Sequence, residues 1–148
     1  MCGVQHLSMD EVRSAAFVNK GALAEQFVAQ HLHFLGPDNR APSLHYWLRG
    51  GRAANAEVDF VVPVGQAVVP VEVKAGKSGS LRSVHQFVFR KNAGAAVRFD
   101  TNPPSLQRAE HVLSLPEGRR RIAFDLLSLP LYLCEQLPRL FRQGIRTP

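Results

Sequence analysis

The chain has 148 residues, enough for one domain with a single hydrophobic core, and its 45% apolar and 20% charged content is ordinary for a globular protein. Lys and Arg total 18 against 12 Asp and Glu, and the net charge of +6 favours a polyanionic partner such as nucleic acid. Two cysteines far apart in the chain, no signal-peptide pattern and no apolar run near the ~20 residues of a membrane helix argue against secreted and membrane proteins, so we expect a soluble cytoplasmic domain.

The first half of the chain predicts a helix and three strands. Residues 19–34 carry apolar side chains at helical spacing, with Asn19 as a candidate N-cap and Gly36-Pro37 as a stop signal. Three short segments rich in β-branched or aromatic residues follow, and they cover residues 44–50, 56–63 and 67–75. The tight connection between the last two segments predicts an antiparallel hairpin.

The second half predicts a helix over residues 81–91 and a strand over 95–100. Residues 102–118 are expected to form mostly loop with one short strand, and residues 119–130 a strand and turn. A short C-terminal helix follows over 129–143, which Pro138 is expected to kink or end. The resulting order is αβββαβ, an α/β fold in a domain of residues 19–136, with an N-terminal extension (1–18) and a C-terminal tail (137–148).

Charged residues interrupt the two most hydrophobic strands, in the segment AEVDFVVPVGQAVVPVEVKAGKSG (residues 56–79). Alternation along a strand places Glu72 and Lys74 on one face, and Glu57 and Asp59 on one face of the preceding strand, opposite Val58 and Phe60. In a hairpin, an acid of the first strand then lies beside Glu72 and Lys74. Carboxylates of this kind hold Mg²⁺ in proteins. The alternative is a half-exposed hairpin with a charged outer face, which is common in antiparallel sheets.

The spacing of these residues resembles the PD-(D/E)XK nuclease superfamily, whose restriction-endonuclease-like core is αβββαβ with a mixed central sheet flanked by helices. The resemblance lies in Asp59, in the Glu-x-Lys of Glu72 and Lys74 one hairpin later, and in the preceding helix with Glu25. More narrowly, the blocks NKGALAEQFVAQHL, LHYWLRG, AEVDFVV and VPVEVKAGK are similar to a C-terminal nuclease-like domain, of unassigned function, in prokaryotic AAA-type ATPases. The similarity covers residues 18–100 and the block LLSLPLYL.

The chain departs from this family pattern in two ways. Val58 stands where the superfamily's name has proline, which is a common variation. No ATPase module precedes the match, and Gly76-Lys77-Ser78 is not a P-loop because Val71 occupies the position of the first glycine. We therefore expect a stand-alone domain, a remnant, or a piece of a larger protein.

The resemblance implies a role for each site residue. Asp59 and Glu72 would bind Mg²⁺ or Mn²⁺ together with the Val73 carbonyl. Lys74 would orient or help to activate the attacking water, and Glu25 would be a further metal ligand or a hydrogen-bond acceptor. A metal would neutralise charge on a phosphodiester, lower the pKa of a water and align its attack.

Two further polar residues are open to two interpretations each. Glu57 could assist or replace the neighbouring acid on its strand, or form a salt bridge with an arginine. Gln86 matches a position where some superfamily members carry a polar active-site residue, but it also fits an exposed helix residue. Basic residues that could line a phosphate backbone, or could be solvated surface, are Arg82, Arg90, Lys91, Arg119, Arg120 and Arg121.

These observations predict a Mg²⁺-dependent nuclease that hydrolyses phosphodiester bonds in DNA. The alternative from another class is a catalytically inactive module that binds nucleic acid or protein partners for an AAA-type ATPase. A third possibility is an accessory domain of a toxin–antitoxin or defence system with a vestigial site. The sequence leaves the oligomeric state undetermined.

Overall fold

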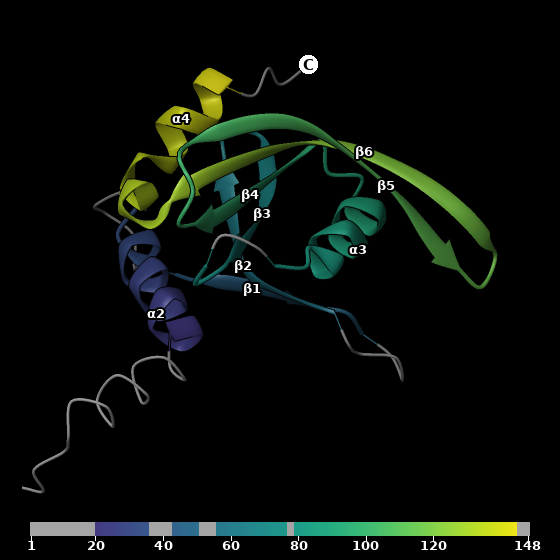
Figure 1. Cartoon of the computed structure of the whole chain (residues 1–148), viewed down its shortest axis with the longest axis horizontal. Helices are drawn as coiled ribbons and strands as arrows, with labels where there is room; N and C mark the ends of the chain where they lie inside the picture. The colour runs from purple at the N-terminus through teal and green to yellow at the C-terminus, as the bar shows by residue number, and fades with distance from the viewer. Residues whose placement is uncertain (1–19, 36–42, 51–55, 77–78, 145–148) are drawn as a thin grey trace, which may run out of the picture.

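The computed structural model describes residues 20–35, 43–50, 56–76 and 79–144, which form a six-stranded mixed sheet with helices on both faces (Figure 1). The strand order is β1-β2-β3-β4-β6-β5. In chain order the elements are α2 (Lys20–His33), β1 (His45–Leu48), β2 (Glu57–Val64), β3 (Ala67–Val73), α3 (Arg82–Lys91), β4 (Ala95–Asp100), β5 (Ser105–Leu115), β6 (Gly118–Pro130), the 3₁₀ helix η1 (Leu131–Gln136) and α4 (Leu137–Gly144). The predicted α/β fold class and its αβββαβ order are confirmed.

The hairpin of β2 and β3 has the predicted antiparallel pairing, from Val64 opposite Ala67 to Phe60 opposite Val71. Gly65 closes the turn with φ of 63°, a left-handed conformation that glycine adopts without steric cost. β3 then pairs in parallel with β4, and β4 in parallel with β6. The predicted N-cap Asn19 and the stop signal Gly36-Pro37 lie outside the described residues.

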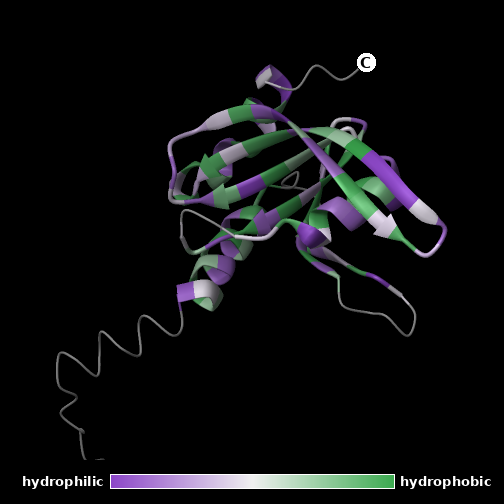
Figure 2. Ribbon diagram, turned by 45° about the vertical axis from the view of Figure 1, so that its right-hand side comes forward, coloured by the Kyte–Doolittle hydropathy of each residue, from purple (hydrophilic) through white to green (hydrophobic). Residues whose placement is uncertain are grey.

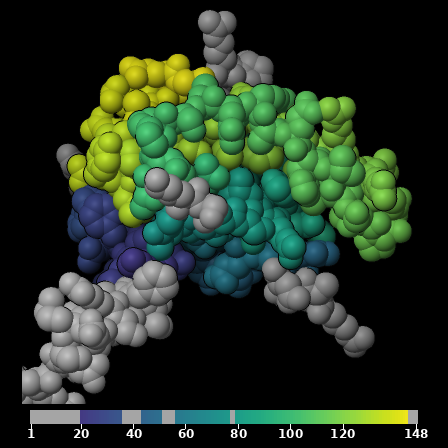
Figure 3. Space-filling view, in the orientation of Figure 1, coloured from purple at the N-terminus to yellow at the C-terminus, as the bar shows by residue number. Residues whose placement is uncertain are grey.

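The prediction for residues 102–130 was wrong in part, because this region forms a long hairpin rather than a loop and a short strand. β5 and β6 pair without interruption from Ser105 opposite Ser128 to Leu115 opposite Gly118. Most side chains of β5 are exposed, so its sequence lacks the apolar alternation that predicts a half-buried strand. The free end of the hairpin extends beyond the body of the molecule (Figures 1 and 3), and hydrophilic residues lie near it (Figure 2).

The C-terminal segment also differs from its prediction. The helix predicted over residues 129–143 is divided just before Pro138 into η1 and α4. Pro138 lies in the first turn of α4, where the missing backbone N–H would have no partner within the helix. Residues 137–144, assigned from sequence to a tail, pack Leu137 and Phe141 fully into the core. Among the described residues, no helix is both long enough and apolar enough to cross a membrane.

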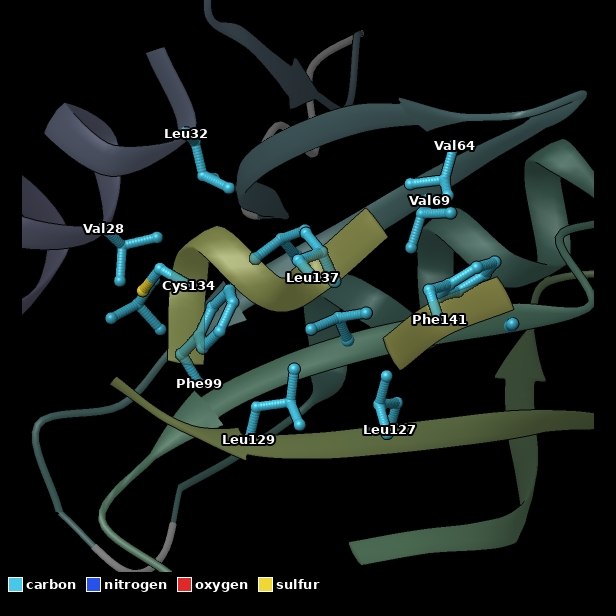
Figure 4. Close-up of a cluster of buried hydrophobic side chains, with 14 of the residues drawn as sticks. Val28, Leu32, Val64, Val69, Phe99, Leu127, Leu129, Cys134, Leu137 and Phe141 are labelled. Atoms are coloured by element: carbon cyan, nitrogen blue, oxygen red, sulfur yellow. The ribbon is translucent and has the colours of Figure 1, made fainter. Parts of the chain in front are cut away.

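Two apolar clusters lie on either side of the sheet. The larger cluster joins residues of α2, η1 and α4 to the central strands, as Figure 4 shows for Val28, Phe99, Leu129 and Phe141 among others. The smaller cluster joins α3 to β4, β5 and β6. Because the central strands are covered on both faces, any charged residue that they carry near the helices is withdrawn from water.

We predict that Phe141→Ala lowers the free energy of unfolding by about 3–5 kcal/mol, because it removes a large side chain that is only 1% exposed. Arg142→Ala, on the exposed side of the same helix, is the matched control and is expected to change it by less than about 0.5 kcal/mol. Urea denaturation of the two variants and the wild type measures both values. Equal stability of Phe141→Ala and Arg142→Ala would show that α4 is not part of the folded domain.

Candidate functional site

A β-bulge positions Asp59. The pairing of β1 with β2 shifts between His45, opposite Val61, and Trp47, opposite Val58. Two residues of β2, Asp59 and Phe60, therefore stand opposite a single residue of β1, Tyr46. A bulge of this type bends the strand and redirects its side chains. The strict alternation expected from the sequence fails here, because Phe60 lines the same pocket as Asp59.

The Asp59 carboxylate replaces a backbone partner of β3. The regular ladder between β2 and β3 reaches Phe60 and Val71. Beyond this pair, the Val73 amide donates to Oδ2 of Asp59 at 2.7 Å. The side chain of one strand thus satisfies the backbone of the next, and the two strands need not stay in contact at the point where the site forms.

Glu72 and Lys74 form an ion pair at the end of β3. The Lys74 Nζ donates to Oε1 of Glu72 at 2.6 Å, and the two side chains are 24% and 7% exposed. The second carboxylate oxygen of Glu72, Oε2, is buried and has no hydrogen-bond partner in the described part of the chain. Burying a carboxylate oxygen without a partner is costly, so this atom is a feature that requires explanation.

Glu25 joins the group from α2. A pocket of about 370 Å³ is lined by Glu25, Tyr46, Glu57, Asp59 and Phe60, so the helix and the bulged strand face each other across it. The structure therefore gathers residues that lie 34 positions apart in the chain, from Glu25 to Asp59, into one acidic pocket beside the Glu72–Lys74 pair.

Burial raises the pKa of each of the three acids. It raises the pKa of Glu72 to about 6, against the Lys74 hydrogen bond, and the Asp59 and Glu25 carboxylates add to the increase. Burial also raises the pKa of Asp59, although the Val73 amide and Lys74 oppose the change. The pKa of Glu25 rises through burial and then through the charge of Asp59. The acids outnumber the one ammonium group that neutralises them.

A metal ion would supply the missing positive charge, and the residues partly fit one. Glu72 offers a buried free oxygen, and Asp59 has one oxygen that the Val73 amide does not use. Within residues 20–35, 43–50, 56–76 and 79–144, however, no three His, Cys, Asp or Glu side chains are arranged as a ready ligand set. The acids are close enough to affect one another's pKa but do not form a preassembled metal cage.

The other candidate residues fall into two groups. Glu57 is exposed and lines the pocket with Asp59, and its predicted salt bridge with an arginine is absent from the described residues. Gln86 lies on α3 with its Oε1 buried and without a partner there. Its side chain is therefore more enclosed than the exposed helix position that the sequence allowed. Val73 is the buried last residue of β3, and its amide donates to the Asp59 carboxylate.

Sequence reasoning missed Gly79, which leaves room for the Lys74 side chain. A Cβ at this position would lie 2.5 Å from Cδ of Lys74 and 2.9 Å from its Cε. Only glycine therefore allows the lysine stem its observed path. The cluster Gly76–Gly79 signalled a loop, but its closeness to one side chain depends on the tertiary structure.

Sequence reasoning also missed a row of polar residues on the adjacent strands β3, β4 and β6. In the sheet Glu72 lies beside Arg98, and Arg98 lies beside Ser128. Arg98 Nε is 2.8 Å from Oδ2 of Asp100, an ion pair without hydrogen-bond geometry, and Ser128 Oγ has no partner among the described residues. These residues lie on three parallel strands near their carboxyl ends, where ligands commonly bind in α/β sheets.

We predict that Glu72→Gln raises the free energy of unfolding by about 2 kcal/mol at neutral pH, from a pKa shift of 4.5 to about 6 at ~1.4 kcal/mol per unit. The folded state binds the proton more tightly than the unfolded state. The contribution of Glu72 to wild-type stability is therefore greatest below pH 4.5 and is lost as the pH rises through about 6. Urea denaturation at several pH values measures the difference, which should vanish below pH 4.5. Glu117→Gln, in an exposed turn, should show no such trend.

We also predict that Gly79→Ala displaces the Lys74 side chain and raises the pKa of Glu72 further, because the lysine hydrogen bond lowers it. An NMR pH titration of the Glu72 side-chain carboxyl carbon measures the change. Gly94→Ala is the control, since a Cβ at Gly94 meets no atom within 4 Å and its backbone is not left-handed. An unchanged titration in Gly79→Ala would show that Lys74 reaches Glu72 by another path.

Comparison with known proteins places the chain in one family, whose description assigns it no function. Neither the curated proteins nor the solved structures contain a significant match to this chain. The profile of one protein family, described as a domain of unknown function (DUF4143), matches residues 20–118. The match covers α2, the three-stranded unit with the acidic pocket, α3 and the hairpin strand β5. The chain belongs to the DUF4143 family.

Proposed function

We propose that this domain is a Mg²⁺- or Mn²⁺-dependent nuclease that hydrolyses phosphodiester bonds in DNA. The observation that carries the proposal is the buried Glu72 carboxylate. One of its oxygens is held by Lys74 at 2.6 Å, the other has no partner in the described structure, and two further acids raise its pKa. Strongly perturbed acids beside a lysine are typical of catalytic sites.

Asp59 and Glu72 would hold the cation in this proposal, and the Val73 carbonyl would complete the protein ligands. Glu25 would ligate it or accept a hydrogen bond from a bound water. The metal would supply a Lewis acid at the scissile phosphate and a water of lowered pKa. A divalent cation would also favour the ionised form of the three acids, whose pKa values are raised in its absence.

Lys74 would offset negative charge on the scissile phosphate and orient the attacking water. Its ammonium contacts Glu72 and is close enough to Asp59 and Glu25 to oppose the rise in their pKa, and the missing side chain of Gly79 leaves room for its stem. A positioned cation at the site where charge develops is an effective source of transition-state stabilisation. Lys74 would have to share its hydrogen bonds between Glu72 and the substrate, which its three N–H donors permit.

The order αβββαβ, the spacing of the site residues and the basic charge support DNA as the substrate. The net charge is +6, and the basic residues of α3 and of the β5–β6 turn lie on the surface. Contacts from such residues to phosphates would supply affinity that falls with added salt. By the resemblance to the ATPase-associated domains, an AAA-type ATPase is the proposed protein partner.

A catalytically inactive module that binds DNA or a protein partner is the second candidate. It is favoured by the missing preassembled ligand set in the described residues and by the close Glu72–Lys74 pair, which neutralises part of the acidic charge without a metal. The two candidates share a fold and a surface, so activity and metal binding distinguish them.

For a catalytic site we predict DNA cleavage with Mg²⁺ or Mn²⁺ that stops in EDTA. Lys74→Ala should reduce cleavage by about 100-fold or more because it removes the cation that serves the reaction. Asp59→Asn should reduce cleavage and also weaken Mn²⁺ binding in calorimetry, because it removes one negative ligand. DNA affinity should survive both changes and fall with salt.

Asp125→Asn is the matched control, since Asp125 lies in the β5–β6 hairpin and pairs with Arg108 rather than with the site. It should keep wild-type cleavage. The substrates should include single-stranded, duplex and branched DNA. No heat of Mn²⁺ or Mg²⁺ binding, together with no metal-dependent cleavage of any of them, would leave the inactive binding module as the better account.

A further inference from the structure

β5 is a long edge strand with one side open. It has eleven residues, pairs with β6 without a bulge, and contains no proline. In the described part of the chain it has no strand partner on its other side. The opposite edge, β1, has only four residues. Natural proteins usually shorten, bulge or cover an edge strand because its unpaired backbone groups can bind another chain. Among the described residues, β5 is neither shortened nor bulged, and no further strand covers its open side.

The outer face of β5 carries an ordered set of exposed side chains. Every second side chain of β5 lies on this face, which carries Leu106, Arg108, Glu110 and Val112. Leu106 is 47% exposed and Val112 is 51% exposed. Within the chain, Arg108 pairs with Asp125 at 3.0 Å, and Glu110 pairs with Arg121. Each of these ion pairs is largely exposed, so both charged groups on β5 remain available to a neighbouring strand.

We propose that a second copy of this chain pairs antiparallel along β5, with Ala109 on the two-fold axis. In this register Arg108 of each copy stands opposite Glu110 of the other. Leu106 stands opposite Val112, and Gln107 opposite His111. The pairs Arg108–Glu110, Leu106–Val112 and Gln107–His111 therefore each occur twice, once on either side of the axis, as an interface with two-fold symmetry requires.

The charges select this register over its neighbours. Moving the axis to residue 108 places the two Arg108 side chains opposite each other, and moving it to residue 110 does the same for Glu110. Like charges directly opposite on paired strands are destabilising, whereas opposite charges are stabilising. With the axis at Ala109, the acids and arginines alternate across four strands: Asp125 and Arg108 of one copy, then Glu110 and Arg121 of the second.

Sedimentation of charge-reversed variants tests the proposal. Wild type should show a concentration-dependent dimer. Arg108→Glu places acid opposite acid in its homodimer, and Glu110→Arg places arginine opposite arginine, so each variant alone should be monomeric. An equimolar mixture of the two should regain a dimer, because each cross-copy pair is then one acid and one arginine. Damage within the hairpin cannot produce this recovery, since each variant carries the same internal change alone and in the mixture.

Controls separate the interface from general charge effects. Arg119→Glu and Glu117→Arg make the same charge changes at exposed positions beyond the overlap, and both should dimerise like wild type. Val112→Glu, on an exposed side chain that should not affect folding, should be monomeric. A wild type that stays monomeric at all concentrations, single variants that dimerise, or a mixture that does not would each overturn the proposal. Because no step involves metal or DNA, the outcome is independent of nuclease activity.

Discussion

The hydrogen bond from the Val73 amide to the Asp59 carboxylate is the interaction on which the candidate site depends. It lies where the β2–β3 ladder stops, just beyond Phe60 and Val71. A buried amide left without a partner costs about 1–3 kcal/mol, so the carboxylate satisfies β3 while β2 bends away. The bulge opposite β1 lies at this point of β2, and it is Phe60 that leaves the regular alternation, since Asp59 still lines the pocket with Glu57. The acidic pocket follows from this local departure from the sheet.

The electrostatics of the site oppose the stability of the fold. Burial raises the pKa of Glu72, Asp59 and Glu25, which means that the folded state disfavours the charges these groups carry in neutral solution. Lys74 offsets part of this cost through a single short contact. A sheet built for stability alone would place apolar side chains here, as it does at Val71 and Val73 beside them. Such a cost is characteristic of a binding or catalytic site.

The acidic pocket and the proposed pairing edge lie at opposite ends of the sheet. The acidic pocket lies on β2 and β3, near the short edge strand β1, whereas β5 forms the opposite edge. Pairing of two copies through β5 would extend the sheet and leave both pockets uncovered at its outer ends. Helix α4 packs in the larger apolar cluster together with the β6 residues Leu127 and Leu129, which anchors the base of the β5–β6 hairpin. The free end of the hairpin projects from the body of the molecule (Figure 1).

The sequence by itself predicted the helices and strands whose apolar residues recur at the spacing of a helix or of a strand. Residues 19–100 carry that pattern, and their helix, hairpin, second helix and parallel strand are where it predicted them. Alternation alone also predicted that Glu72 and Lys74 point to the same side, as their ion pair at the end of β3 confirms. β5 escaped prediction because its side chains are nearly all exposed, and its partner β6 supplies its stability. Pro138 marks the boundary between η1 and α4, because a proline is tolerated in the first turn of a helix but not in its interior.

Tertiary structure alone decided how the site is assembled. The bulge at Asp59 exists because β1 and β2 pair out of step, and no local pattern encodes that offset. Glu25 meets Asp59 only once α2 packs on the sheet, and Gly79 matters only because Lys74 passes beside it. Raised pKa values likewise come from burial by distant segments. Local propensity therefore specified the strands and helices, while long-range packing decided which charged residues lie together in the site.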